Sequence, residues 1–347
     1  MRRFDYSFIR EMKISAGTMS LANKIEASRY REGQRKKFNS EVFIALESIA
    51  RIQSVKGSNA IEGIVTTDAR LEEIVNKKSA PLNHNEMEIA GYRDVLDTIH
   101  REYRTLKLDE ELVKSLHRVM LTYTPAGGGA YKQQDNIIIS TDENGVRSVR
   151  FVPTTAEETP TAMEQLILAY MDAKDDAGID PLILIPCFIL DFLCIHPFPD
   201  GNGRISRILT LLLMYKNGID VGKYISFEAQ INGTKNRYYE ALRRSSEEWH
   251  SNNNDYVPFV ENFIFTLFSC YKELDRRFDV MENKKMNKGN RIEAAVLNSI
   301  APISKKEIAE ILPDVSITTI EAKLSELQKQ GKIKKIGGNK DARYARK

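Results

Sequence analysis

The sequence predicts a mainly α-helical protein that carries one β-hairpin and ends in a small winged helix-turn-helix domain. Apolar residues recur at helical spacing through most of the chain, and β-prone runs are confined to 136–153 and to the last residues. A polar, glycine-containing linker at 283–290 separates the main helical part from the winged helix-turn-helix domain. With 347 residues, 42% of them hydrophobic, the chain is long enough for more than one domain.

Four helices are expected in the first part of the chain. In the stretch 40–53, Phe43, Leu46 and Ile49 share one face, and Ser40 is expected as the N-cap. Further helices are expected at 68–76, 85–103 and 109–121.

A β-hairpin is expected next, because two short β-prone runs, 136–140 and 148–153, flank the turn signal Asn144-Gly145. A lone hairpin is marginally stable in water, so this one should pack on a helical part of the protein.

The longest apolar run, 182–195, is read as a buried helix. It is too short to cross a membrane and contains Asp191, so no membrane partner is expected. Asp180 should cap this helix, Pro181 should begin it and His196-Pro197 should end it. The first residues lack the apolar segment of a signal peptide, and the three cysteines form no CxxC pair, so a reducing cytoplasmic setting is expected.

The last 65 residues read as three helices followed by two short strands around Gly337-Gly338, the pattern of a winged helix-turn-helix. They hold 15 Lys and Arg against 7 Asp and Glu, although the whole chain carries a net charge of only +3. DNA binding is therefore one interpretation, and protein contact is the other. The basic residues around the expected wing are Lys332, Lys334, Lys335, Lys340, Arg343 and Arg346.

The stretch "HPFPDGNGRISR", residues 196–207, carries the chemistry of the chain. Arg204 and Arg207 are expected to share a face in the first turn of a helix, where the helix dipole disfavours positive charge. An anion bound between them would explain this placement, since glycine-flanked backbone N–H groups and two arginines suit a polyphosphate. Asp200 then suits Mg²⁺, and His196 suits a general base. Each residue alone is compatible with a simple turn, but their combination is not typical of one.

This stretch resembles the signature HxFx(D/E)GNGRxxR of the Fic (filamentation induced by cAMP) family at every fixed position, and the resemblance extends over roughly 85–275. It implies a Fic-type helical bundle with a hairpin flap. Fic proteins typically transfer AMP from ATP to a protein hydroxyl. The resemblance implies that His196 is the base, that Asp200 is the Mg²⁺ ligand, and that the residues contacting the phosphates are Gly201, Asn202, Gly203, Arg204 and Arg207.

Two further features follow from the resemblance. Tyr239, with Tyr238 beside it, would border the adenosine, although helix packing would equally explain both tyrosines. The hairpin at 136–152 would hold a target segment by strand addition. The phosphorylating branch of the family has lysine at the position of Gly203, so glycine favours nucleotidyl transfer.

An upstream stretch, "SNAIEG", resembles the inhibitory motif (S/T)xxxE(G/N) of the family through Ser58, Glu62 and Gly63. In the family this glutamate pairs with the second arginine of the signature, which is Arg207 here. Such a pair would occupy the site that a γ-phosphate needs. The alternative is that Glu62 ends a helix and faces water, with Gly63 as a C-cap.

The sequence thus predicts an autoinhibited AMP-transferase with an N-terminal helical region (1–84), a Fic core (85–282) and a winged helix domain (288–347). Its substrates would be ATP and a target protein, self-modification included, with Mg²⁺ as cofactor. Use of another nucleotide, removal of AMP from a target, and an ATP-sensing DNA-binding regulator are the alternatives. Pairing of subunits through the N-terminal helices is left open.

Overall fold

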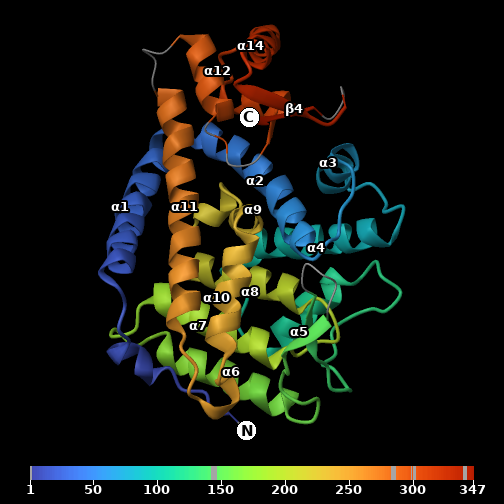
Figure 1. Cartoon of the computed structure of the whole chain (residues 1–347), viewed down its shortest axis with the longest axis vertical. Helices are drawn as coiled ribbons and strands as arrows, with labels where there is room; N and C mark the ends of the chain where they lie inside the picture. Colours follow the sequence, from blue (N-terminus) through green and yellow to red (C-terminus); the bar gives the residue numbers. More distant parts are fainter. Residues whose placement is uncertain (1, 142–146, 283–286, 298, 300–301, 339–341) are drawn as a thin grey trace.

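The computed structural model describes residues 2–141, 147–282, 287–297, 299, 302–338 and 342–347. Helices dominate it, as expected (Figure 1). The helices are α1 (Ala16–Phe38), α2 (Ser40–Ile61), α3 (Asp68–Lys77), α4 (His84–Glu102), α5 (Glu110–Met120), α6 (Thr159–Ala173), α7 (Pro181–Ile195), α8 (Asn202–Lys216), α9 (Phe227–Gly233), α10 (Lys235–Ser246), α11 (Val257–Glu282), α12 (Lys288–Leu297), α13 (Lys305–Ile311) and α14 (Ile317–Lys329). Short 3-10 helices lie at Ser7–Glu11, Val221–Lys223 and Trp249–Ser251.

Helix α7 runs through the core and ends at the site described below. The side chain of Asp180 accepts a hydrogen bond from the Leu182 N–H, and Pro181 is the first helical residue, as the sequence predicts. The helix ends at His196, whose backbone is left-handed (φ 52°). α7 and α8 share one hydrophobic core with helices of the N-terminal region, so α2 and α4 are built into the same packed unit.

The hairpin is present as β1 (Ile138–Thr141) and β2 (Arg147–Phe151), which pair antiparallel. The expected turn at Asn144-Gly145 lies outside the described residues. The hairpin packs on the 3-10 helix at Trp249–Ser251, where the ring of Phe151 stacks on His250 at 5.5 Å between centroids and contacts Trp249. This packing supplies the support that an isolated hairpin lacks.

The N-terminal helices differ from the prediction in two respects. Helix α1 was not among the expected helices, because it is rich in charged residues and has few apolar ones. Helix α2 begins at Ser40 itself, so Ser40 is not the N-cap. Asn39 holds that position without a side-chain cap, and α2 continues beyond the expected end to Ile61.

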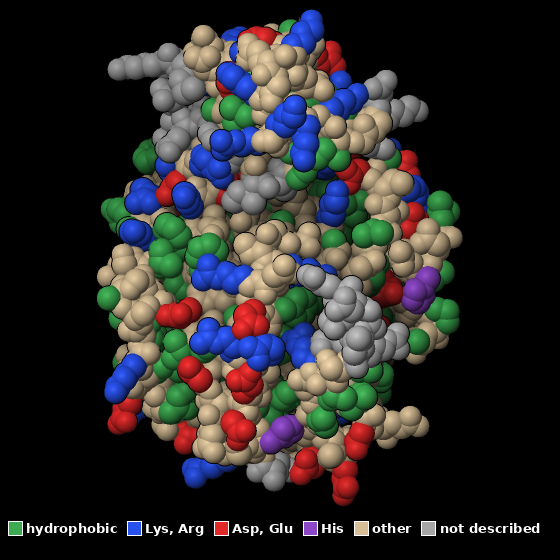
Figure 2. Space-filling model, viewed as in Figure 1, with side chains coloured by type: hydrophobic (Ala, Val, Ile, Leu, Met, Phe, Trp, Pro, Cys, Tyr) green, Lys and Arg blue, Asp and Glu red, His purple; other side chains and the backbone are tan. Residues whose placement is uncertain are grey.

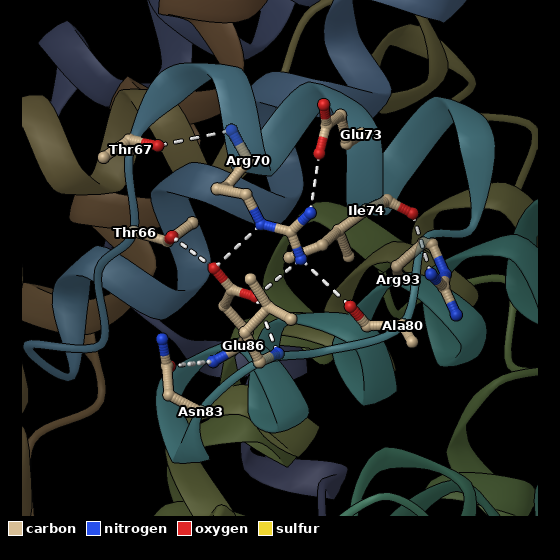
Figure 3. A network of polar contacts seen from close by, with 10 residues as sticks. Thr66, Thr67, Arg70, Glu73, Ile74, Ala80, Asn83, Glu86 and Arg93 are labelled. Atoms are coloured by element: carbon tan, nitrogen blue, oxygen red, sulfur yellow. Dashed lines mark hydrogen bonds and ion pairs between the residues drawn. The ribbon is translucent and has the colours of Figure 1, made fainter.

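Helix α3 is fixed to α4 by a polar network whose first residue, Thr66, lies shortly after Gly63. Figure 3 shows Arg70 of α3 directed at Glu86 of α4, with Nη2 donating to Oε2 at 2.8 Å. Glu86 also accepts from Thr66 and from the Leu82 N–H, while Arg70 donates to the Ala80 carbonyl. The segment between Gly63 and α4 is therefore held at several points.

The C-terminal elements form a second hydrophobic cluster. Helices α12, α13 and α14 pack with a three-stranded sheet of order β3-β5-β4, made of β3 (Ile303–Ser304), β4 (Ile333–Ile336) and β5 (Arg343–Arg346). β3 was not expected from the sequence. Ser304 and Glu307 form a capping box at the start of α13. Ile49 of α2 belongs to this cluster, so the C-terminal elements pack against α2.

None of the helices in the described part of the chain is both long enough and apolar enough to span a membrane.

Close packing between α4 and α5 yields a stability prediction. A methyl group on Gly91 of α4 would lie 2.7 Å from the carbonyl carbon of Met120, which belongs to backbone and cannot turn away. Gly91→Ala is therefore expected to lower the free energy of unfolding by about 3 kcal/mol in urea titrations. Gly33→Ala is the control: it is exposed in α1, its methyl group would meet no atom within 4 Å, and it should stabilise by roughly 0.5 kcal/mol. Equal effects of the two substitutions would contradict this packing.

Candidate active site

A cavity of about 900 Å³ lies where the α7–α8 loop, α10 and the hairpin meet. It brings together nearly all of the residues that the sequence analysis singled out. Its lining includes Glu62, Ile138, Arg150, His196, Asp200, Gly201, Asn202, Gly203, Arg204, Arg207, Lys235, Tyr238 and Tyr239. A cavity of this size suits a nucleotide-sized molecule.

The loop between α7 and α8 is held in one conformation by its own side chains. The Asn202 side chain bonds both ways to Phe198, since its Oδ1 accepts from the Phe198 N–H at 2.9 Å and its Nδ2 donates to the carbonyl at 2.8 Å. Gly201 has φ 78°, a conformation that favours glycine, and it precedes the first residue of α8. The loop therefore presents the positive end of α8 to the cavity.

His196 is held so that one ring nitrogen is available. Its Nδ1 lies 3.2 Å from the Leu193 carbonyl, which assigns the proton to Nδ1 and leaves Nε2 with its lone pair. Burial lowers the pKa of His196 to about 4, although the hydrogen bond to Leu193 acts in the other direction. The imidazole is thus neutral at pH 7, which is the form that accepts a proton.

Arg207 is buried and bound to Ser58 and Glu62 at the end of α2. Its Nε donates to the Ser58 hydroxyl at 2.8 Å, and its Nη2 donates to the Ser58 carbonyl at 3.0 Å and to Glu62 Oε1 at 2.8 Å. The arginine side chain is 3% exposed and that of Glu62 is 32% exposed. Glu62 therefore has room to move into solvent, whereas Arg207 does not.

Glycine at position 203 lets Glu62 reach Arg207. A methyl group on Gly203 would overlap Glu62 Oε1 and would lie 3.3 Å from Arg207 Nη1. Gly63 has φ 80° directly after Glu62, which is the C-cap residue of α2. The two interpretations of Glu62 are thus both partly realised: it ends its helix, and its carboxylate binds Arg207.

Arg204 is held by a carboxylate that the sequence analysis did not identify. It pairs with Glu88 of α4, and both side chains are almost fully buried. Its Nη2 also lies 3.5 Å from Asp200 Oδ2. Arg204 is the third residue of α8. Arg207 is the sixth and lies in the second turn, so its placement in the first turn was wrong.

Asp200 presents its carboxylate to the open cavity. Its side chain is 81% exposed, and its Oδ1 accepts a hydrogen bond from the Gly201 N–H. Within the described part of the chain, no group of three or more His, Cys, Asp or Glu side chains is placed to hold a metal ion. A single carboxylate beside a phosphate site still fits Mg²⁺, which binds one or two carboxylates together with substrate phosphates.

The hairpin side of the cavity carries cations around an aromatic ring. Tyr239 lies under two of them, with the Arg150 guanidinium 5.1 Å and the Lys235 ammonium 5.8 Å from its ring centroid. Tyr238 is buried, and its ring contacts that of Tyr239 at 5.4 Å. Lys235 Nζ also donates to the carbonyl of Ile61, the residue before Glu62.

Sequence reasoning missed three side chains that hold this site: Glu88, His117 and Lys132. His117 of α5 accepts from the Gly129 N–H through Nδ1, so its Nε2 donates to the Asp200 carbonyl at 3.1 Å. Its ring stacks on Phe198 at 3.8 Å between centroids. These residues stand in segments remote from the signature and form no local pattern.

Comparison with known proteins finds relatives of part of this chain. Residues 107–214 match the model of the Fic/DOC family. The chain is 27% identical over 224 residues to "Protein adenylyltransferase Fic" of Nematostella vectensis, which covers 61% of this chain and 45% of that protein. It is 35% identical over 71 residues to "Protein adenylyltransferase fic-1" of Caenorhabditis elegans, covering 20% of this chain and 13% of that protein. The matched part thus spans less than half of these two relatives.

Solved structures resemble the fold. A Fic family protein from Desulfovibrio desulfuricans G20 matches with a TM-score of 0.59 and 20% identity, covering 97% of both chains. A Fic domain containing signaling protein from Bacteroides thetaiotaomicron VPI-5482 matches with a TM-score of 0.60 and 21% identity, covering 74% of this chain and 95% of the other. The molecule therefore has the mainly helical fold of Fic structures. Together with the family match, this identifies a Fic/DOC domain at residues 107–214 of the chain.

Proposed function

We propose that this chain is an autoinhibited protein adenylyltransferase, which transfers AMP from ATP to a serine, threonine or tyrosine hydroxyl of a target protein. The observation that carries the proposal is one cavity lined by a neutral His196, by the first residues of α8 and by Arg204 and Arg207, the latter bound to Glu62. The names of the two relatives support the same activity.

In the proposed reaction, the target hydroxyl oxygen attacks the α-phosphorus of ATP. The new bond joins this oxygen to phosphorus, the bond from the α-phosphorus to the bridging oxygen breaks, and pyrophosphate leaves. His196 Nε2 takes the hydroxyl proton as the bond forms. The α8 N–H groups, Arg204 and Arg207 stabilise the phosphate charge, which grows on the leaving pyrophosphate.

Mg²⁺ would be held by Asp200 together with the phosphates and would neutralise part of their charge. The hydrogen bond from the Gly201 N–H to Asp200 Oδ1 orients this carboxylate, and His117 holds the backbone behind it. The chain itself thus arranges a single oxygen ligand at the rim of the phosphate site.

The hairpin would hold the target segment. Ile137, Ile139 and Val149 are all about half exposed or more, and β1 and β2 are paired only with each other among the described strands. A strand added to an edge is held mainly through its main chain, so target side chains would be read only weakly. Docking on residues 136–152 is part of the proposal, and self-modification would use the same surface.

The proposal divides the chain into three parts: an N-terminal region with the inhibitory motif (1–84), a catalytic core (85–282) and a winged helix domain (288–347). Figure 2 shows Lys and Arg side chains gathered over the C-terminal elements at the top of the molecule. Two of the wing cations form ion pairs within the protein, however, since Arg343 binds Glu307 and Asp68, and Lys332 binds Glu293. These pairs disfavour the DNA-binding alternative, which a gel shift at low salt would test.

Nucleotide choice provides the direct test of the transferase. The Glu62→Gly variant, incubated with ATP, GTP, CTP or UTP labelled on the α-phosphate, is expected to incorporate label from ATP at least about tenfold faster than from the others, measured by gel autoradiography. Incorporation of label from UTP alone would show that UTP, and not ATP, is the substrate. If the wild type releases AMP from a pre-modified target and no transfer of AMP is seen, the enzyme removes AMP and the transferase proposal is wrong.

A further inference from the structure

Lys132 is buried beside the candidate active site and has no role in the reaction proposed above. Its side chain is 3% exposed, yet its ammonium is held by neutral oxygens: Nζ donates to Asn136 Oδ1 at 2.9 Å and to the Ile195 carbonyl at 3.1 Å. Within the described part of the chain, Lys132 forms no ion pair. Burying a charge without an ion-pair partner is costly, so this placement calls for an explanation.

The bonds of Lys132 enclose His196. Its side chain binds the carbonyl of Ile195, the residue before His196, and its backbone N–H donates to the carbonyl of Pro197, the residue after it, at 2.8 Å. His196 stands between them with φ 52°, a left-handed conformation that is uncommon for residues other than glycine. Lys132 thus binds a backbone carbonyl on each side of the residue with the left-handed conformation.

Lys132 also connects this turn to the hairpin. Asn136 lies just before β1, and the backbone N–H of Ala156, beyond β2, donates to the neighbouring Asp135 at 2.7 Å. The base of the hairpin and the end of α7 therefore meet at Lys132. In addition, a cation at the C-terminal end of α7 is favoured by the helix dipole.

We propose that Lys132 is a positioning residue for the transfer: it holds the carbonyls on both sides of His196, places a positive charge at the Ile195 carbonyl that precedes it, and ties this turn to the base of the hairpin. This inference rests on the proposed function, because it assumes that His196 acts as the base.

The charges around His196 and Lys132 give the expected direction of the pKa change of His196. Burial lowers the pKa of His196 to about 4, and the charge of Lys132 adds to this effect, whereas Glu62 and Asp200 oppose it. Burial also lowers the pKa of Lys132 to about 8, with Asp135 opposing. Below about pH 8, Lys132 is thus charged and favours the neutral imidazole; without this charge the pKa of His196 should rise.

The test uses the full-length chain in the Glu62→Gly background. Lys132→Met removes the charge and both side-chain bonds, Lys132→Arg keeps the charge, and Lys107→Met is the control at an exposed lysine. Two readouts are combined: the pKa of His196 from NMR of labelled imidazoles, which needs no activity, and the pH profile of kcat with ATP.

For Lys132→Met, the pKa of His196 is expected to rise by about one unit. Its kcat is expected to fall about tenfold at pH 7 with KM for ATP unchanged, and Lys132→Arg should restore the low pKa. An unchanged pKa of His196 in Lys132→Met would overturn the proposal, as would a KM for ATP that rises in step with the loss of kcat. If no variant transfers AMP while the pKa still shifts, the proposed function fails and the link between Lys132 and His196 stands.

Discussion

Glu62→Gly is expected to raise AMP transfer by about 10- to 100-fold over the wild type, measured as label incorporated from ATP. The estimate follows from the bond that the substitution removes. A hydrogen bond between charged groups contributes about 1.5–3 kcal/mol, and each 1.4 kcal/mol is a factor of ten. In the proposed autoinhibited state, ATP has to displace Glu62 from Arg207 before its γ-phosphate can bind there.

The geometry explains why loss of Glu62 should not damage the site. Ser58 still accepts two hydrogen bonds from Arg207, through its hydroxyl and its carbonyl, so the buried guanidinium keeps its position. The N–H of Nη2 that Glu62 had accepted is then free to donate a charge-assisted hydrogen bond to a phosphate oxygen. Activation should therefore come from an intact cavity with one obstruction removed.

Two further variants sharpen the test. Glu62→Ala should activate like Glu62→Gly, which would exclude an effect of glycine on the end of α2. Glu41→Ala, at an exposed carboxylate in the first turn of the same helix, should leave the rate unchanged. Equal rates for Glu62→Gly and the wild type, in a preparation that does transfer AMP, would contradict autoinhibition by Glu62.

The parts of the fold that the sequence predicts well are those with strong local signals. Helix α7 has its cap at Asp180, a proline at its first position and a His-Pro stop, and the structure places its ends as expected. Helix α2 extends beyond its expected end because its second half is held by tertiary contacts. A methyl group on Gly57 would lie 2.8 Å from the backbone nitrogen of Ala229, so α2 and α9 pack backbone against backbone. No pattern within α2 alone contains that information.

The same distinction holds for the candidate site. Residues from His196 to Arg207 are close in sequence, so their combination is visible in one motif. The pairing of Arg207 with Glu62 spans 145 positions and could be predicted only from the family resemblance. Glu88 and Lys132 had no such guide, and a buried Glu or Lys looks like any surface residue in the sequence. Their roles depend on tertiary contacts with Arg204 and with the end of α7.

His196→Asn is expected to lower kcat by about 10²–10⁴-fold in the Glu62→Gly background, which is the usual contribution of a general base. Asparagine is the sharper choice than alanine, because position 196 has φ 52° and asparagine adopts this conformation more readily than most residues. The variant should therefore keep the loop and lose only the proton acceptor, as a single-turnover assay with labelled ATP would measure.

The control for this variant is ATP binding. His196 Nε2 faces the attacking hydroxyl in the proposed reaction, while the phosphates are held by the start of α8, so the dissociation constant of ATP should stay within about twofold in calorimetry. Weaker ATP binding in parallel with the lost rate would mean that the substitution had disturbed the loop. Retained transfer in His196→Asn, with normal ATP binding, would show that another group accepts the proton, and the proposed role of His196 would be wrong.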